Sequence, residues 1–468
     1  MKKILFILLV SAFSFPLFSQ HISGNWKGEL NVSGINLRII FHITEKDSLY
    51  LATLDSPDQG AYDLPVDSIF FTENHLKLIM NKLGAEYSGN YNPEKNEIFG
   101  NFMQVGQSFP LNLKKTENKE IRKKKYQEPE KPYPYISEEI TFFNKKAGIT
   151  LAGTLTLPRK EGKFPAVILI SGSGAQNRDE GLLGHKPFLI ISDYLTRKGI
   201  AVLRFDDRGT AESGGNFKSA TTKDFADDVE AALNYILSRK EIDKKNIGLI
   251  GHSEGGLIAP MLAVRNKNIA FIVLLAGPGI TGEKILSMQS QLIGKANGAT
   301  DKELKESRKL NKKIYTLLKN EKDTSILKQK ITSLLSNEFK KQNATSKLSE
   351  ENIQTFINNQ IKVLISPWFR YFLIYNPAKT LEKVTCPVLA LFGSKDMQVP
   401  PEENKKAIKK ALKKAGNTDF KIEILPNLNH LFQECETGSP AEYAKIEQTL
   451  SPVALKEISD WIKNHLKN

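Results

Sequence analysis

The first hundred residues after the N-terminal segment consist of short runs in which apolar and polar residues alternate. Such runs are Asn36 to Ile43, Leu49 to Leu54, Leu76 to Met80 and Glu97 to Phe102, and turn-forming residues separate them. A period of two residues is that of a β-strand with one buried face. We therefore expect residues 20–116 to form an antiparallel all-β module, a small barrel or sandwich.

From residue 138 onward, fully apolar β-branched runs alternate with stretches that favour helix. Strands that are buried on both faces are apolar throughout, and they are typical of parallel sheets. We therefore expect residues 138–468 to form an α/β domain with a mostly parallel sheet and helices on both faces. The predicted strands are Ile140 to Asn144, Leu151 to Leu157, Ala166 to Ile170, Ile200 to Arg204, Ile247 to Ile250, Phe271 to Leu275, Val388 to Phe392 and Lys421 to Leu425.

Two intervals depart from these patterns. Residues 117–137 combine a run of basic residues with Pro129, Pro132 and Pro134, which predicts an extended, solvated linker. Between Gly279 and Pro387 about a hundred residues favour helix and contain no convincing strand. This interval is too long for a loop in a compact domain, so we expect a helical lid over residues 281–375.

The N-terminus has the pattern of an export signal. Lys2 and Lys3 precede an apolar run from Ile4 to Val10, and small or polar residues follow around Ser19. This pattern predicts a Sec-type signal peptide over residues 1–19 and export to the periplasm or the medium. A buried strand or a retained anchor helix is the alternative. No later stretch is apolar enough to span a membrane.

Composition narrows the class of protein. The chain has 468 residues, of which 40% are apolar and 25% charged, which excludes collagen, coiled coil, polytopic membrane protein and wholesale disorder. Only Cys386 and Cys435 occur, so a disulfide framework is excluded, and one bridge between them is left open.

The chain is basic, with a net charge of +14, and the excess is concentrated in the predicted lid. Between Thr281 and Thr385 there are 19 Lys and Arg against 10 Asp and Glu, which gives +9. No recognised nucleic-acid-binding fold accompanies this charge, so we expect no nucleic-acid partner. A solvated helical cap that attracts anionic substrates or an anionic surface explains it better.

The strongest chemical motif is Gly-His-Ser-Glu-Gly-Gly at residues 251–256, between the predicted strand ending at Ile250 and a helical stretch. Gly-x-Ser-x-Gly at a strand-to-helix turn places the serine in strained backbone geometry at the helix N-terminus, where it is exposed. Ser253 is therefore the candidate nucleophile. A tight glycine turn without chemistry is the alternative.

A serine nucleophile needs a base and an acid, which follow it in the chain order Ser, Asp, His. Only His430 and His465 come after Ser253, and His465 is three residues from the C-terminus. Of the aspartates before His430, Asp301 and Asp323 fall in the lid and Asp419 precedes a strand. Asp396 directly follows the strand Val388 to Phe392. We therefore predict His430 as the base and Asp396 as the acid.

An acyl-transfer site also needs backbone N–H groups for the oxyanion. The N–H of Glu254 is expected to supply one, and the loop at residues 171–175 the other, with Ser173 as first choice and Gly174 as second. The segment at residues 205–209 is expected to brace this loop through an Asp–Arg pair. Trp368, Phe369, Tyr371 and Phe372 are candidates for the pocket wall or for core packing. We expect no metal and no cofactor.

From Ile140 to the C-terminus these motifs resemble the α/β-hydrolase superfamily, within it the bacterial carboxylesterases of the EstD type and those related to dienelactone hydrolase. The motifs are Ser171 to Gly174 with Asn177 to Asp179, Asp206 to Gly209, Gly251 to Gly256, Gly393 to Asp396 with Val399-Pro400, and Asn429-His430. The resemblance implies Ser253, Asp396 and His430 as the triad. It departs at the oxyanion loop, where the frequent His-Gly is Ser171-Gly172. Separately, Gly24 to Leu30 resembles the first strand of lipocalin-like barrels, with Trp26 as an end plug.

Three functions are compatible with this reading. The first is a secreted serine esterase acting on a small-molecule ester through an acyl-enzyme intermediate. The second is an aminopeptidase or oligopeptidase of the S33 or S9 type, since those peptidases share the triad order. The third is a secreted binding protein that uses its β module and keeps the hydrolase fold as a scaffold. The acyl and alcohol parts of the substrate and the oligomeric state are left open.

Overall fold

The computed structural model describes residues 22–32, 35–47, 49–59, 61–104, 107–117, 125–342 and 350–467. The chain divides into two compact units: the first ends at residue 121, and the second comprises residues 122–468 together with residues 57–61. The predicted signal peptide at residues 1–19 and most of the basic run after residue 117 lie outside the described residues.

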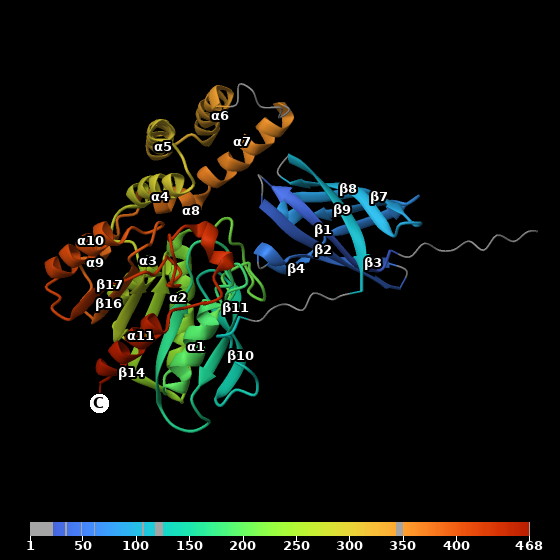
Figure 1. The fold of residues 1–468 in the computed structure, drawn as a ribbon. Helices are drawn as coiled ribbons and strands as arrows, with labels where there is room; N and C mark the ends of the chain where they lie inside the picture. Colours follow the sequence, from blue (N-terminus) through green and yellow to red (C-terminus); the bar gives the residue numbers. More distant parts are fainter. Residues whose placement is uncertain are drawn as a thin grey trace, which may run out of the picture. The chain divides into compact units, whose positions relative to one another are not determined.

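The first unit is a single antiparallel sheet of nine strands in the order β4-β3-β2-β1-β9-β8-β7-β6-β5 (Figure 1). It is therefore a half-barrel and not a two-sheet sandwich, and its curvature brings β5 near β3 at the other end of the sheet. The strands are β1 (Gly24–Val32), β2 (Ile35–Lys46), β3 (Leu49–Ser56), β4 (Ala61–Pro65), β5 (Ser68–Thr72), β6 (His75–Met80), β7 (Ala85–Asn92), β8 (Glu97–Gln104) and β9 (Gln107–Thr116).

Curvature of this sheet encloses an apolar core in which Trp26 is fully buried. The indole Nε1 of Trp26 donates to the carbonyl of Ile22 at 2.7 Å, as a packed tryptophan should. Gly89 and Gly100 face each other across β7 and β8, and a Cβ at either would lie 2.7 Å from the Tyr87 hydroxyl. These glycines therefore make room for the Tyr87 side chain.

The second unit contains an eight-stranded sheet in the order β10-β11-β13-β12-β14-β15-β16-β17. β11 is antiparallel to both of its neighbours, and all pairings from β13 through β12 to β17 are parallel. The strands are β10 (Ile136–Asn144), β11 (Ile149–Leu157), β12 (Phe164–Ile170), β13 (Ala201–Phe205), β14 (Ile242–His252), β15 (Phe271–Leu275), β16 (Val388–Gly393) and β17 (Phe420–Leu425). The predicted mostly parallel α/β sheet is thus confirmed.

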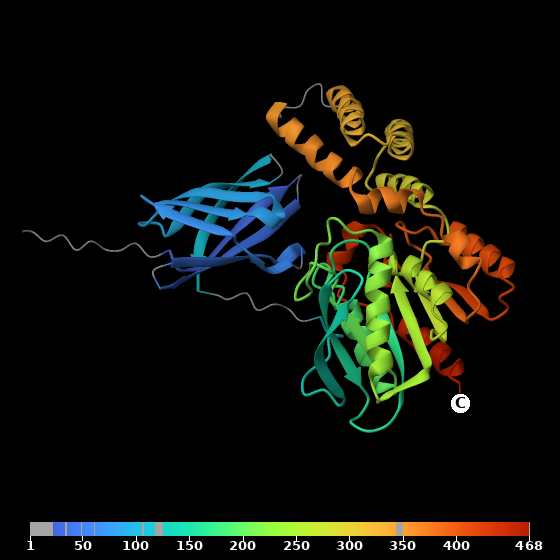
Figure 2. The ribbon, with the colours of Figure 1, turned by 180° about the vertical axis from the view of Figure 1, so that it is seen from behind.

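Helices cover both faces of this sheet. α1 (Pro187–Arg197) and α11 (Pro452–Asn464) pack on one face, and Figure 1 shows them in front of the strands. The other face is covered by α2 (Thr222–Ser238), α3 (Gly255–Arg265), α9 (Pro377–Leu381) and α10 (Pro401–Lys414), and Figure 2 shows α2 in front. Both faces bury apolar side chains, which explains why the strands lack polar alternation.

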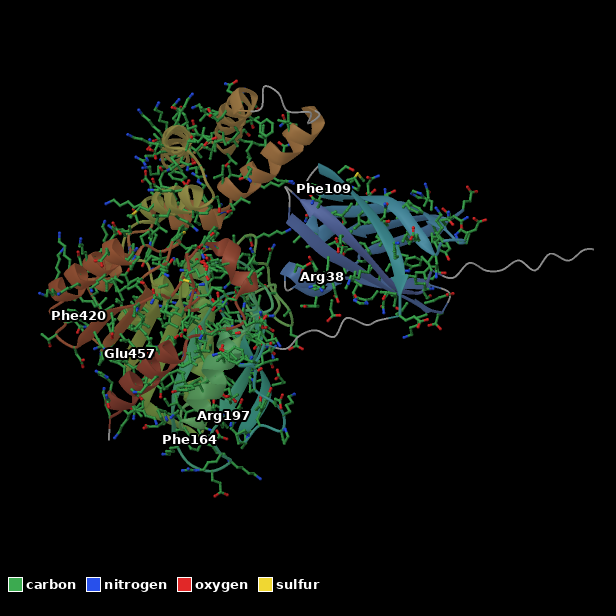
Figure 3. The ribbon with its side chains drawn as sticks, viewed as in Figure 1. Arg38, Phe109, Phe164, Arg197, Phe420 and Glu457 are labelled. Atoms are coloured by element: carbon green, nitrogen blue, oxygen red, sulfur yellow. The ribbon has the colours of Figure 1, made fainter. Side chains whose placement is uncertain are left out.

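Between β15 and β16 the structure places a helical layer at the carboxyl ends of the strands. Figure 3 labels Phe164, the first residue of β12, at the end of the sheet away from these helices. The helices have a small apolar core of their own, built around Ile314, Leu327 and Phe369. They are α4 (Gly282–Ala296), α5 (Asp301–Asn320), α6 (Thr324–Gln342), α7 (Glu350–Leu364) and α8 (Pro367–Ile374).

The segment at residues 125–135 differs from the solvated linker that its composition predicts. Gln127 accepts hydrogen bonds from the backbone N–H groups of Thr449 and Leu450, and the Lys125 ammonium donates to the Ile446 carbonyl. The Glu128 carboxylate, mostly buried, pairs with Lys186 at 2.8 Å. Long polar side chains thus hold this segment against the rest of the second unit. The pattern of apolar residues cannot predict contacts of this kind.

Cys386 and Cys435 are both free thiols. Within the described ranges, no helix is long and apolar enough to cross a membrane.

Candidate active site

Ser253 lies between the end of β14 and the start of α3, in the left-handed region of backbone space with φ of +51°. Such a conformation costs a residue other than glycine about 1–3 kcal/mol, and the surrounding structure must offset the cost. Its own N–H donates to the Leu275 carbonyl at 2.8 Å, and its carbonyl accepts from the Gly256 N–H at 2.9 Å. The turn is therefore held from both sides.

The glycines of the motif are required by the close approach of strand and helix. A Cβ on Gly251 would lie 2.1 Å from the Gly255 carbonyl oxygen, and a Cβ on Gly255 would lie 2.2 Å from the carbonyl oxygen of Ile170. Neither backbone neighbour can move without displacing a strand or the helix. The spacing Gly-x-Ser-x-Gly is thus set by steric contact.

Asp396 and His430 meet at the ends of two adjacent strands. Asp396 follows β16, His430 follows β17, and the His430 Nδ1 lies 2.8 Å from Asp396 Oδ2. The other carboxylate oxygen accepts the backbone N–H groups of Gln398 and Val399 at 2.7 and 2.8 Å. Both side chains are almost fully buried. Because Nδ1 donates to the carboxylate, Nε2 is left as the proton acceptor.

The oxyanion loop, residues 171–175, follows β12. Ser173 lines the same cavity as Ser253, whereas Gly174 does not. The N–H of Gly172 is already engaged, since it donates to the Glu180 Oε1 at 2.7 Å. Of the two candidate second donors, only Ser173 lines the cavity, and both stay predictions.

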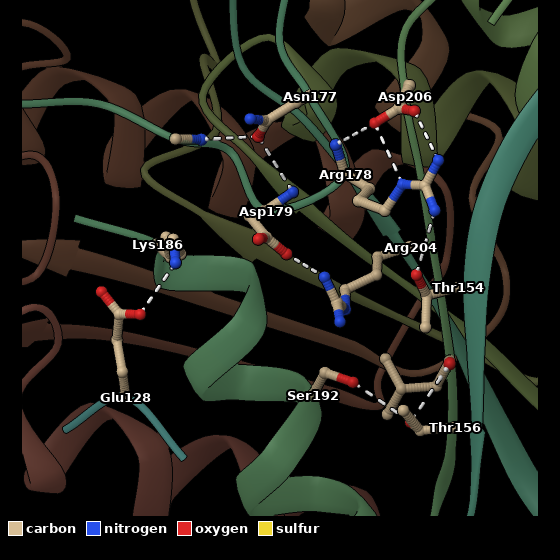
Figure 4. Close-up of polar contacts among 12 residues, drawn as sticks. Glu128, Thr154, Thr156, Asn177, Arg178, Asp179, Lys186, Ser192, Arg204 and Asp206 are labelled. Carbon is tan, nitrogen blue, oxygen red and sulfur yellow. Dashed lines mark hydrogen bonds and ion pairs between the residues drawn. The ribbon is translucent and has the colours of Figure 1, made fainter. Parts of the chain in front are cut away.

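Two aspartates, buried Asp206 and partly buried Asp207, hold this loop and the residues that follow it. Asp206 accepts hydrogen bonds from the backbone and guanidinium of Arg178, as Figure 4 shows. Asp207 accepts the Ser171 hydroxyl at 2.7 Å and the Gln176 N–H at 2.9 Å. Burial raises the pKa of Asp207 to about 8, against the opposing effect of these two bonds. The loop itself is thus held by Asp207 without an arginine; the Asp–Arg pair is Asp206 with Arg178, three residues beyond the loop, while Arg208 pairs with Asp228.

A cavity of about 290 Å³ connects these groups with the lid. Of the four aromatic candidates, Trp368 and Phe372 line it, and Phe369 and Tyr371 do not. The reason is the helical period of α8: residues four apart share a face. Phe369 packs in the core of the lid, and Tyr371 stacks on Tyr375.

The side chain of Glu254 points into the protein. Both of its oxygens lie within 2.9 Å of the Trp368 Nε1, which donates to them, and Oε1 also accepts the Thr222 hydroxyl at 2.6 Å. Burial raises the pKa of the Glu254 carboxyl, and the hydrogen bonds oppose it. This carboxylate therefore joins α3 to α2 and to the lid helix α8.

Sequence reasoning missed Glu180, which lines the cavity and bonds to His252, the residue before the nucleophile. It also missed Gln398, whose amide nitrogen donates to the Tyr443 hydroxyl at 3.1 Å beside the acid. No local pattern marks either residue, because their partners are distant in the chain. Among the described side chains, no group of three or more His, Cys, Asp or Glu is arranged to hold a metal ion.

Comparison with known proteins finds similarity to serine hydrolases. The family model of serine aminopeptidase, S33, matches residues 188–353, which include Ser253, and that of the prolyl oligopeptidase family matches residues 351–466, which include Asp396 and His430. Esterase EstD of Thermotoga maritima is 27% identical over 346 residues, covering 74% of this chain and 72% of the relative. The chain has the α/β-hydrolase fold and is similar to these serine hydrolases.

This α/β-hydrolase also resembles proteins over shorter or more divergent spans. The human mitochondrial acyl-coenzyme A thioesterase 2 is 30% identical over 125 residues, which are 27% of this chain and 23% of that protein. The structure of the Pyrococcus furiosus esterase Pf2001 covers 70% of this chain and 93% of its own, at 14% identity and a TM-score of 0.42.

Proposed function

We propose that the chain is a serine esterase whose triad is Ser253, Asp396 and His430. The observation that carries the proposal is the buried Asp396–His430 pair, with 2.8 Å between Oδ2 and Nδ1, whose histidine lines the same cavity as the strained turn of Ser253. The predicted enzyme class, a carboxylic ester hydrolase, is also supported by the relative named esterase.

In the proposed reaction, His430 Nε2 takes the proton of the Ser253 hydroxyl as the oxygen attacks the ester carbonyl. The N–H groups of Glu254 and Ser173 stabilise the oxyanion. His430 then gives its proton to the leaving alcohol, which departs and leaves an acyl-enzyme. Water, deprotonated by the same imidazole, hydrolyses this intermediate, while Asp396 stabilises the imidazolium in both steps.

The chemistry of the cavity favours a small, uncharged ester. No lysine or arginine is among the described residues that line it, and both ring nitrogens of His252 are engaged, by Glu180 and by the His430 carbonyl, so a substrate carboxylate or phosphate would find no free cationic partner there. Nine apolar side chains form one part of the wall, and carboxamides, hydroxyls, imidazoles and two carboxylates form the rest. The residues of the apolar wall are Leu182, Pro187, Pro278, Ile285, Leu286, Trp368, Phe372, Val399 and Leu431.

A peptidase is the second candidate, because both matching family models are named for peptidases. An aminopeptidase needs a carboxylate for the free amine of its substrate, and the Glu254 carboxylate is engaged by Trp368 and Thr222. Comparing kcat/KM for p-nitrophenyl acyl esters with that for aminoacyl p-nitroanilides tests the proposal. We expect faster ester cleavage; faster anilide cleavage reverses the assignment. A folded chain that fluorophosphonates do not label would revive the third function, a secreted binding protein with a hydrolase scaffold.

Replacing Trp368 by Ala is expected to raise kcat/KM for longer acyl esters relative to p-nitrophenyl acetate. The indole forms part of the cavity wall, and removing it deepens the cavity. An acyl-length series on both proteins measures the ratio. Tyr371→Ala is the matched control, because it removes an aromatic ring from the same helix on a face that does not line the cavity. If this ratio of kcat/KM values changes equally in both variants, the assignment of Trp368 to the cavity wall is contradicted.

Export is a further part of the proposal and is supported by residues 1–19 alone. N-terminal sequencing of the protein from cell fractions tests it. A new N-terminus near Gln20 in the periplasm or the medium is expected, and an intact Met1 in the cytoplasmic fraction would contradict it.

A further inference from the structure

A buried carboxylate outside the triad connects two of the loops at the strand ends. Glu180 lies between β12 and α1, and 6% of its surface is exposed. Its Oε1 accepts the N–H of Gly172 in the oxyanion loop at 2.7 Å. The same oxygen lies 2.9 Å from Nδ1 of His252, the residue before the nucleophile. One atom therefore positions both the oxyanion loop and the nucleophile turn.

His252 extends this link to the loop that carries the base. Its Nε2 lies 3.1 Å from the backbone carbonyl oxygen of His430. Both partners of the ring, a carboxylate and a carbonyl, only accept hydrogen bonds when Glu180 is ionised. A neutral imidazole has one N–H and can make only one of the two bonds. Both are made when His252 is an imidazolium that pairs with Glu180.

The surroundings of His252 support this charge state. Burial lowers the pKa of the His252 imidazole, but the Glu180 carboxylate and its hydrogen bond reverse the effect, and the net shift is upward. Asp396 on the neighbouring loop adds to the rise, and the His430 ring lies 4.9 Å from the His252 ring, centre to centre. The charged groups that face the ring are therefore mainly anionic.

We propose that Glu180 is a positioning residue, which holds Gly172 and, through protonated His252, the His430 backbone in the geometry that acyl transfer needs. The inference rests on the proposed esterase function. Glu180 touches none of the reacting atoms. Its effect should therefore appear in kcat and in the pH dependence, and KM should change little.

The test is Glu180→Gln, which keeps the shape of the side chain and removes its charge. Without that charge His252 loses its proton at a lower pH and keeps one of its two bonds. We expect kcat for p-nitrophenyl esters to fall by about 10- to 100-fold at pH 8, the size of effect that a small misplacement of catalytic groups produces. The ratio of variant to wild-type kcat should rise as the pH is lowered, because His252 is protonated again.

Glu128→Gln is the matched control. Glu128 is also a mostly buried carboxylate with one cationic partner, Lys186, but it does not line the cavity (Figure 4). Its variant should keep the wild-type kcat and pH profile. If Glu180→Gln behaves in the same way, the proposal is wrong.

A proton NMR spectrum in water gives a readout that does not depend on activity. The wild-type protein should show a strongly deshielded imidazole proton for each partly or fully buried histidine–carboxylate pair: His430 with Asp396, His252 with Glu180 and His42 with Asp55. Glu180→Gln should remove the resonance of His252 and leave the others, and Glu128→Gln should remove none of them. If the folded wild-type protein shows the His252 resonance but does not turn over esters, the esterase proposal is refuted and the proposed contact between Glu180 and His252 stands. If no resonance depends on Glu180, the proposed role of Glu180 as a partner of protonated His252 is refuted.

Should Glu180→Gln fold poorly, His252→Gln provides the second variant, because a glutamine amide cannot reproduce both bonds of the imidazolium. It should lower kcat to a similar extent with little change in KM. A wild-type kcat in His252→Gln would overturn the proposal, since the link from Glu180 to His430 passes through this ring.

Discussion

Replacing Ser253 by Ala is expected to lower kcat for p-nitrophenyl acetate on the order of 10⁶-fold, as the loss of a serine nucleophile does in other triad enzymes. The variant keeps the turn, because alanine tolerates the φ of +51° no worse than serine and the backbone bonds do not involve the hydroxyl. What it loses is the atom that forms the acyl-enzyme. Steady-state kinetics measure the loss, and thermal unfolding checks that the variant is folded.

Ser238→Ala is the control for this result. Ser238 is the last residue of α2, and its hydroxyl donates only to the Tyr235 carbonyl one turn earlier. Its variant should hydrolyse the ester at the wild-type rate and react with a fluorophosphonate, whereas Ser253→Ala should do neither. Turnover by a folded Ser253→Ala variant at the wild-type rate would remove Ser253 from the mechanism and with it the esterase proposal.

The sequence was sufficient for those parts of the site in which local pattern and chain order agree. A buried strand before Gly251 and glycines on both sides of Ser253 define one turn, because only that spacing avoids the contacts at 2.1 and 2.2 Å. Elimination among a few histidines and aspartates led to Asp396 and His430, which the structure places in contact. Both follow strands of a parallel sheet, whose carboxyl ends must lie on one edge.

The sequence alone did not predict which face of a helix or a sheet is buried. The aromatic residues of α8 were left open between the cavity wall and core packing, and only the structure separates them: Trp368 and Phe372 line the cavity, whereas Phe369 and Tyr371 lie on other faces of the helix. Similarly, the alternation of apolar and polar residues predicted the strands of the first unit, but not whether they form one curved sheet or two packed sheets. A single curved sheet and a two-sheet sandwich require the same pattern of buried residues.

Contacts between distant loops left no local pattern at all. Glu180 and His252 are separated by 72 residues, and His252 and the His430 carbonyl by 178. The brace of the oxyanion loop likewise uses Arg178 with Asp206, although Arg208 is closer in sequence to that aspartate. A charged side chain is matched to its partner by the fold, so composition alone predicts that a pair exists and not which residues form it.

Replacing Asp396 by Asn is expected to lower kcat on the order of 10⁴-fold with little loss of stability. The asparagine oxygen must face the N–H groups of Gln398 and Val399, because the opposite orientation would set an NH₂ group against two donors. The amide then donates to His430 Nδ1, which forces the imidazole proton onto Nε2. A protonated Nε2 cannot take the proton of the Ser253 hydroxyl, so the base is lost while its position is kept.

Asp419→Asn is the matched control for this change. Asp419 also lies beside a histidine, 3.2 Å from the Nε2 of His465, but it precedes β17 and does not line the cavity. The same loss of charge there should leave kcat and KM for p-nitrophenyl acetate at their wild-type values. A loss of activity in Asp419→Asn that equals the loss in Asp396→Asn would mean that the tautomer of His430 does not determine the rate. The assignment of the acid would then have to be abandoned, even though the Asp396–His430 hydrogen bond is present in the structure.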